Sequence, residues 1–572
     1  MERLETKQVK GHTYYYYSRW ARIDGRCRRV WQRYLGKLED LVQAVEGGPR
    51  PHSAEVFQYG LTEALWKECA QIETVGIVDQ HIRKRNQGLS TGQYLAIAAI
   101  NRAIAPRSKR SMWEWFSQTT LLRHLPAASP ATLTSQRFWD HMDRIDAKTA
   151  TQLWQEVLRG VVQREHIDLS SVSYDGTNFY TFIDTFNVRC QVAQRGKNKQ
   201  GRNNLRQVSY ALFCCADGHL PLFYDVYEGH RNDAKQFPVL LRRFHEFFAR
   251  LGRDGQQPET TLVFDKGNNS VDNFLLLDQL NYKFVGSVKL GQHRDLADVS
   301  NHDGRFRSCA SVDLEGTKAF RVLRTVAGKE RVLVVTYNQN LFDSQLKTVH
   351  KDVARALEKL AVLRGRLEDR AAGLVKGGRA PTVAAVERKC QTILSRQYLK
   401  RIVHTQVRLG EDQRCRLEYQ MDATALQTVC DTNLGKTILI SNRSEWDDER
   451  IIRAYRSQFI IEGVFKETKD RDTGIWWRMH HWTDSKIHVH ALYCTIALLL
   501  RALMLRRAVQ AGLPLSMPRL LSELRRVREV VTIYPRKRSN STTSQTVLSK
   551  TSELQQQLLS LLGIGSKNVE LG

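Results

Sequence analysis

Two aspartates stand where the chain could perform metal-dependent chemistry. Asp175 follows the apolar run 171–174, and Asp265 follows the run 261–264. We expect each run to be a β-strand, with a glycine close behind each aspartate that lets a phosphate or a metal approach the backbone. Neighbouring carboxylates repel each other, and a bound divalent cation removes that cost. Carboxylate oxygens favour Mg²⁺ or Mn²⁺.

A third carboxylate, Glu462, lies in the segment 448–470, which we expect to be one helix. Five residues recur at intervals of three and four along it: Tyr455, Gln458, Glu462, Phe465 and Lys469. This spacing places them on one helical face. Because most of these side chains are polar, we interpret the face as one wall of a wet, charged site.

Each carboxylate also has an ordinary explanation when it is taken alone. An aspartate at the end of a strand is a common turn residue. Glu462 is four residues before Lys466, and this spacing is typical of an ion pair on a helix surface. A catalytic site is favoured only because the three carboxylates occur together, in this order and on these elements.

These motifs resemble those of insertion-sequence transposases with a ribonuclease-H-like catalytic core. The resemblance is to the branch whose third motif reads Tyr-x2-Arg-x3-Glu-x6-Lys. That motif is matched by Tyr455, Glu462 and Lys469, with Gln458 in place of the arginine. Asp175 with Thr177 is similar to the first motif, and Asp265 with Gly267 to the second. The resemblance covers most of the chain, least clearly at 300–435 and after 513.

The resemblance implies a catalytic centre in which Asp175, Asp265 and Glu462 bind two divalent ions, Mg²⁺ or Mn²⁺. Such a centre cleaves an element's end and joins the freed 3′-hydroxyl to target DNA. The side chains expected to contact DNA are Tyr455, Gln458, Lys469, Lys266, Arg456 and Arg478. Gln458 keeps a hydrogen bond but loses the charge of the family's arginine.

The composition favours a polyanionic partner. The chain has 87 Lys and Arg against 60 Asp and Glu, a net charge of +27. Such an excess suits phosphate neutralisation, with a membrane surface as the weaker alternative. We expect double-stranded DNA as the partner (the element's terminal inverted repeats and target DNA) and a homodimer on paired ends.

Other features narrow the class of protein. No P-loop is present, so we expect no ATP dependence. The apolar run 491–500 is broken by Arg501 and is too short to span a bilayer. We interpret it as a buried helix and expect no membrane association. With no visible signal peptide, the expected location is the cytoplasm of a bacterium, on DNA.

The fold class we expect is α/β. It is a ribonuclease-H-like mixed-sheet core, interrupted by an insertion of strands plus a long helical hairpin, with N-terminal β-rich and helical additions. Six segments are expected: a β-rich unit at 1–50, a helical DNA-binding and assembly region at 51–165, the first part of the core at 166–300, the insertion at 301–435, the second part of the core at 436–512 and a basic helical tail at 513–572.

Several elements are predicted with a local reason. Asp24 and Gly25 are typical of a hairpin turn between the strands 14–18 and 28–35. Ser90 and Gln93 form a capping box that begins a helix. Residues 172–288 have the order strand, strand, strand, helix, strand, helix, strand, with a three-stranded antiparallel start.

Two further functions remain open besides transposition. One is a non-catalytic DNA-binding descendant of a transposase, which the three carboxylates disfavour and Gln458 mildly favours. The other is a metal-dependent DNA nuclease that does not join strands.

Overall fold

The computed structural model describes most of the chain: residues 1–46, 51–83, 88–198, 201–251, 259–375, 377–470, 473–476, 479–535 and 542–564. It divides into two compact units. The terminal unit comprises Met1–Glu68, Lys109–Ser135 and Arg507–Gly572. The core unit comprises Cys69–Ser108 and Gln136–Arg506. All the carboxylates singled out above belong to the core unit.

A ten-stranded mixed sheet forms the centre of the core unit, in the order β11-β12-β13-β16-β10-β9-β5-β7-β6, with β8 paired to β7. Its strands are β5 (Ser171–Tyr180), β6 (Gln194–Arg195), β7 (Arg206–Cys215), β8 (Pro221–Glu228), β9 (Thr261–Phe264), β10 (Lys283–Val288), β11 (Arg307–Ser308), β12 (Thr317–Val326), β13 (Lys329–Asn338) and β16 (Lys436–Ser441). β5, β9 and β10 are parallel, whereas β5, β7 and β8 form the antiparallel start. The predicted α/β class is confirmed, and the predicted order of elements over 172–288 is correct except that it missed the two-residue strand β6.

Helices of the core unit precede, connect and follow these strands. They are α3 (Thr74–His81), α4 (Thr91–Ile104), α7 (Ser135–Met142), α8 (Ala147–Glu165), α9 (Asp233–Ala249), α10 (Val271–Gln279), α11 (Arg294–Ala297), α16 (Asp448–Arg456), α17 (Gln458–Thr468) and α18 (Asp484–Gln510). The capping box is confirmed, since Ser90 and Gln93 bond reciprocally at the start of α4. The expectation of one helix over 448–470 was wrong, because Ser457 separates α16 from α17.

Helix α18 is long and apolar enough to cross a membrane, but 94% of its most apolar window is buried inside the protein. Such burial is typical of a core helix. Arg501, which interrupts the apolar run, is itself buried and donates to the carbonyl of Ala103 at 2.7 Å. A buried guanidinium is tolerated when it is hydrogen-bonded in this way. The prediction of a buried helix is confirmed.

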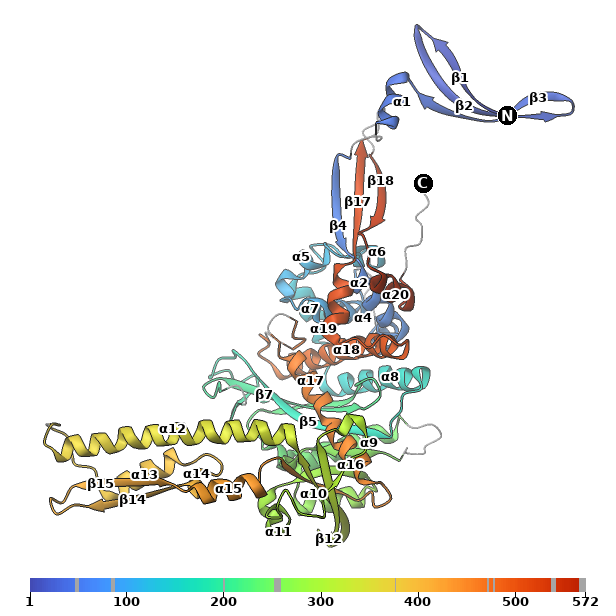
Figure 1. Ribbon diagram of the computed structural model, residues 1–572. Helices are drawn as coiled ribbons and strands as arrows, with labels where there is room; N and C mark the ends of the chain where they lie inside the picture. Colours follow the sequence, from blue (N-terminus) through green and yellow to red (C-terminus); the bar gives the residue numbers. More distant parts are fainter. Residues whose placement is uncertain are drawn as a thin grey trace. The chain divides into compact units, whose positions relative to one another are not determined.

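The chain leaves the sheet between β13 and β16. The elements of this insertion are α12 (Gln339–Ala371), α13 (Val383–Ile393), α14 (Leu399–Ile402), β14 (Val403–Leu409), β15 (Cys415–Met421) and α15 (Ala423–Thr432). α12 runs beside the β14–β15 hairpin (Figure 1). The two pack around a hydrophobic core of their own that includes Val353, Leu360 and Ile402. β11, β12 and β13, which we expected within the insertion, continue the central sheet instead.

The terminal unit contains two three-stranded sheets. One consists of β1 (Glu2–Val9), β2 (His12–Ile23) and β3 (Arg26–Gly36), followed by α1 (Leu38–Val45). The predicted turn is confirmed, since Asp24 and Gly25 have φ values of 50° and 74°. The other sheet joins β4 (Ser53–Gln58) to β17 (Arg528–Pro535) and β18 (Thr542–Leu548), which lie side by side in Figure 1.

The helices of the terminal unit are α2 (Gly60–Gln71), α5 (Met112–Phe116), α6 (Leu121–His124), α19 (Met517–Arg526) and α20 (Glu553–Leu561). The expected helical tail from 513 contains α19 and α20, but the expectation missed the strands β17 and β18 between them. The expectation that 51–165 is helical likewise missed β4. β4 and β17 pair with each other although they lie at opposite ends of the chain.

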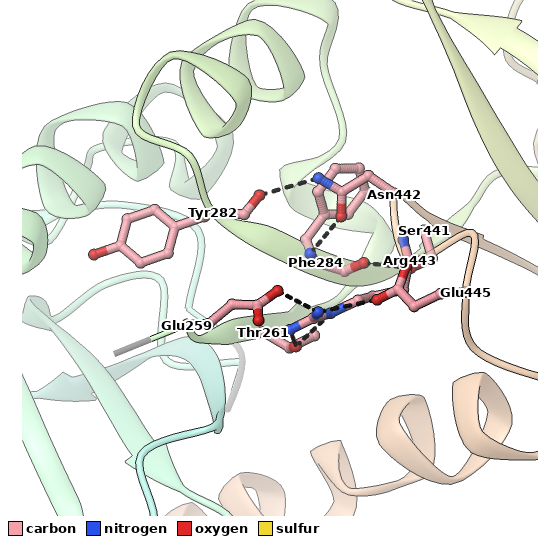
Figure 2. A network of polar contacts seen from close by, with 8 residues as sticks. All are labelled: Glu259, Thr261, Tyr282, Phe284, Ser441, Asn442, Arg443 and Glu445. Carbon is pink, nitrogen blue, oxygen red and sulfur yellow. Dashed lines mark hydrogen bonds and ion pairs between the residues drawn. The ribbon is translucent and has the colours of Figure 1, made fainter. Parts of the chain in front are cut away.

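A buried polar network fixes the ends of three central strands (Figure 2). Arg443, just after β16, donates to the Thr261 hydroxyl at 2.9 Å, at the start of β9. It also pairs with Glu259 at 2.5 Å and Glu445 at 3.0 Å. Asn442 accepts from the Phe284 amide of β10 at 2.8 Å. The network holds the amino end of β9, about 13 Å along the strand from Asp265.

Candidate active site

Asp175 and Asp265 lie at neighbouring positions of adjacent parallel strands. The register of β5 against β9 ends with Tyr174 opposite Phe264, and the aspartates are the next residues in the chain. Asp265 directly follows β9, whereas Asp175 lies inside β5, so the expectation that the first strand ends before Asp175 was wrong. Neighbouring strands are about 4.8 Å apart, so both side chains start from adjacent points on one face. Asp175 is half-buried and Asp265 is exposed.

Helix α17 covers the face of β5 that carries Asp175. Ser173, Asp175 and Thr177 share this face because side chains alternate along a strand. At the start of α17, the hydroxyl of Ser457 lies 3.4 Å from that of Ser173. At its end, the Lys469 ammonium donates to the Thr177 hydroxyl. Glu462, between these two contacts, therefore lies along the helix at the level of Asp175.

Tyr455 connects the second and third carboxylates. Its hydroxyl donates to the Ser287 hydroxyl on β10 at 2.8 Å. Burial raises the pKa of Tyr455 to about 12, and the nearby charges of Asp265 and Glu462 add to the rise. A negative charge disfavours a phenolate beside it, so both carboxylates are close enough to act on one phenol.

The helical face expected to line the site is not uniformly wet. Gln458 is only 8% exposed and Phe465 only 6%. The Phe465 ring meets the Tyr210 ring edge-on, with centroids 6.4 Å apart. Glu462 is exposed, and Tyr455 and Lys469 are half-buried. The prediction was therefore wrong for Gln458 and Phe465, which belong to the packed face of α17.

The remaining candidates for DNA contact are placed differently. Lys266 is exposed directly after Asp265, and its backbone N–H donates to that carboxylate at 2.6 Å. Arg456 is engaged within the protein, donating to the Asp313 carbonyl at 3.0 Å and the Thr317 hydroxyl at 2.6 Å. Arg478 lies outside the described residues.

Comparison with known families decides what this arrangement belongs to. A family model described as "Transposase DDE domain" matches residues 172–500, more than half of the chain. The chain belongs to the DDE transposase family. The matched segment begins within β5 and ends within α18, so all three carboxylates fall inside the transposase domain.

Two solved structures are also similar, each at low identity. A cryo-EM structure of the piggyBac transposase synaptic complex with hairpin DNA is 7% identical, covers 83% of this chain and 82% of that chain, and has a TM-score of 0.37. The Mos1 transposase paired-end complex with left transposon end is 12% identical, covers 35% of this chain and 59% of that chain, and has a TM-score of 0.14. No curated protein matches the chain.

The three carboxylates of the transposase domain offer the oxygen ligands that divalent cations such as Mg²⁺ prefer. Within the described residues, neither Asp265 nor Glu462 forms an ion pair, which leaves their oxygens available to a hard cation. The same residues contain no group of three His, Cys, Asp or Glu side chains placed to bind a metal ion. The three carboxylates therefore do not make up such a group in the described part of the chain.

A basic cleft of about 920 Å³ opens beside this pair in the transposase domain. Its lining runs from Lys266 and Tyr455 to the insertion, and it includes Asp298 and five cationic residues: Lys266, Lys289, Arg294, Arg401 and Lys436. Apart from Lys266, sequence reasoning missed these cations. Lys289 directly follows β10, and the others lie on α11, α14 and β16, so only the tertiary fold brings them together.

Proposed function

We propose that this chain cuts DNA at the ends of its own insertion element and joins the freed 3′-hydroxyls to target DNA. The observation that carries the proposal is that Asp175, within β5, and Asp265, directly after β9, each follow the last paired residue of two adjacent parallel strands. Membership of the DDE transposase family supports the reaction class. We further propose that Glu462 is the third member of the catalytic set.

Asp175, Asp265 and Glu462 would hold two divalent ions, Mg²⁺ or Mn²⁺. When bound, these ions would polarise the phosphate and activate the oxygen nucleophile. Asp175 and Asp265 would form one edge of such a site. Glu462 would complete it by a movement of its exposed side chain toward the pair. Tyr455 and Lys469 flank the carboxylates and would orient the phosphate being cut.

Two in-line displacements account for the chemistry. In the first, a water oxygen attacks phosphorus at the element's end, the bond from phosphorus to the 3′-oxygen breaks, and the 3′-oxygen leaves as a hydroxyl. In the second, that hydroxyl attacks a phosphorus of target DNA and a 3′-oxygen of the target leaves. The number of phosphodiester bonds is unchanged in the second step, so it needs no ATP.

Double-stranded DNA is the proposed partner, both as terminal inverted repeats and as target. The net charge of +27 and the cations of the cleft support a polyanion. We further propose that the chain belongs to the branch with the Tyr-x2-Arg-x3-Glu-x6-Lys motif and acts as a homodimer on paired ends. Residues 1–165 would recognise the ends, and the protein would act in the cytoplasm of a bacterium.

Cleavage of a labelled duplex carrying the element's own end, with Mg²⁺ and a target plasmid, tests the proposal. The wild type should cut to leave a 3′-hydroxyl and join it to the plasmid. Asp265→Asn should bind the duplex but not cut it. Asp272→Asn, an exposed aspartate on α10, is the matched control and should cut normally.

Other results would select the alternatives. Cutting without joining would assign a nuclease. Binding without cutting, with either Mg²⁺ or Mn²⁺, would assign a non-catalytic DNA-binding protein. In that case the Gln458→Arg variant would test whether the family's arginine restores cutting. Gln458 is buried, however, which leaves little room for a larger side chain.

A further inference from the structure

The sheet β1–β2–β3 at the amino end has two chemically different faces. Residues 12–36 contain six arginines and a single acidic residue, Asp24. Residues paired directly across antiparallel strands point to the same side of the sheet. The register therefore divides these arginines between the faces without reference to any other part of the chain.

One face is neutralised internally. Glu5 accepts hydrogen bonds from the Ser18 hydroxyl at 2.9 Å and the Trp20 indole at 2.7 Å. It also pairs with Arg3 at 3.0 Å and Arg29 at 3.6 Å. Trp20 is further covered by the Arg3 guanidinium, 4.5 Å from the ring centroid. Apart from Arg22, the charged groups of this face are therefore satisfied by one another, whereas Arg19 alone of the four arginines on the other face has an ionic partner in the described chain, Glu2.

The opposite face, which we call the arginine face, carries three guanidinium groups without an ionic partner in the described chain: Arg26, Arg28 and Arg33. The register places Arg33 opposite Tyr17 and Trp31 opposite Arg19. The Tyr17 and Trp31 rings meet edge-on, with centroids 6.1 Å apart, and Trp31 is 47% exposed.

We propose that the arginine face binds double-stranded DNA, as a site separate from the carboxylates. The inference rests on the proposed function, because it takes DNA as the partner. From Arg26 to Arg33, β3 spans about 23 Å, and duplex DNA offers one phosphate charge per about 1.7 Å of axis. Paired strands are narrow enough to lie in the major groove.

Charge decides between DNA and a second copy of the chain as the occupant. Two arginine faces meeting in a dimer would place unpaired guanidinium groups against one another, which is unfavourable away from water. Phosphates instead neutralise Arg26, Arg28 and Arg33 and release counterions. The exposed Trp31 and Tyr17 add flat apolar area between the cations, suited to the sugars and base edges of a groove.

Binding of the full chain to a labelled duplex carrying the element's end, titrated at several salt concentrations, tests the proposal. Arg28→Ala with Arg33→Ala should reduce the slope of log affinity against log salt by about 1.8, because two phosphate contacts are lost. Trp31→Ala should lower affinity by about fivefold at an unchanged slope, since it removes no charge.

The matched control is Arg22→Ala with Arg29→Ala, which removes the same charge from the opposite face of the same strands. It should keep the wild-type slope. Equal slopes for both double variants would overturn the proposal, as would loss of a dimer in sedimentation with DNA binding unchanged. Circular dichroism checks that both double variants are folded. If the wild type binds no DNA at all, the proposed function itself fails. If both double variants cut DNA normally, the proposed function stands and only the arginine-face proposal is in question.

Discussion

The hydroxyls of Ser173 and Ser457 lie 3.4 Å apart, although 284 residues separate them in sequence. Ser173 is two residues before Asp175 on the same face of β5, and Ser457 begins the helix that carries Glu462. This contact sets where α17 crosses β5. The distance between the first and third carboxylates is thus governed by packing between one strand and one helix.

Glu462→Gln should abolish cutting while leaving DNA binding intact. The change removes the charge that would hold a cation but keeps the shape of the side chain. We expect a loss of about 10³-fold, since losing several kcal/mol of charge stabilisation costs a factor of ten per 1.36 kcal/mol. The rate of end cleavage with Mg²⁺ measures it. Glu467→Gln on the same helix is the control, and an equal loss there would point to a structural effect.

Lys469→Met should slow cutting by about tenfold, because it removes a cation positioned beside Asp175 through Thr177. Lys466→Met removes an exposed cation from the same helix and should have little effect. Single-turnover cleavage rates at saturating DNA separate this effect from weaker binding. If the two variants behave alike, Lys469 contributes only to the overall charge.

Much of the core could be predicted from local pattern, and the failures have a common cause. Apolar runs ending in Asp175 and Asp265 predict strands, and the register confirms that they are neighbours. The break at Ser457 is not visible because the residue keeps a right-handed helical backbone, with φ −59° and ψ −13°. The helical pattern continues across it. β4 was missed because its only partner, β17, is far along the chain.

The composition of the site was harder to predict than its position. Gln458, Ile461, Phe465 and Thr468 form the buried face of α17. Spacing alone assigns Gln458 both to this face and to the face of Glu462, since the two faces overlap. Ser287, which accepts from Tyr455, gave no signal in the sequence because it lies on β10, far from Tyr455 along the chain.

Tyr455→Phe should alter the alkaline stability of the chain. The folded-state pKa of Tyr455 is raised to about 12, above its ordinary value of 10.0. Its contribution to stability is therefore complete below pH 10 and is lost as the pH rises through 12. At pH 11 the wild type should have lost about 1.4 kcal/mol of unfolding free energy that the phenylalanine variant does not lose. Urea unfolding at pH 9 and pH 11 compares them, and parallel losses would contradict the assignment.

DNA affinity should fall as the pH rises from 7 to 9. Burial lowers the pKa of Lys436 to about 8, so this cation of the basic cleft becomes neutral above that pH. Lys436 is buried and its ammonium donates to the carbonyls of Ala297 and Val299, so its charge acts on a phosphate from within the wall of the cleft. Losing it should cost about 0.5 kcal/mol, or about twofold in affinity. Lys436→Arg keeps its charge and should bind equally at both values. An equal decline in the arginine variant would assign the effect to another group.

Leu360→Ala should destabilise the insertion without disturbing the sheet. Leu360 is fully buried in the separate core between α12 and the β14–β15 hairpin. The cavity should cost about 2–5 kcal/mol, whereas Val362→Ala, at an exposed position of the same helix, should cost under about 0.5 kcal/mol. Hydrogen exchange should show faster opening in 339–432 and unchanged protection in β5 and β9. Faster exchange throughout the sheet would mean that the two cores unfold together.

The position of β16 has a consequence for how the enzyme is made. β16 lies between β13 and β10, yet it is synthesised only after the entire insertion. Until it emerges from the ribosome, β10 and β13 each keep an unpaired edge, and the nascent chain holds two partial sheets. Glu462 is translated later still. If the proposed function holds, a nascent chain can already bind DNA through its amino-terminal sheet, but it cannot cut DNA before this late folding step, because the sheet that carries Asp175 is still open and Glu462 is absent.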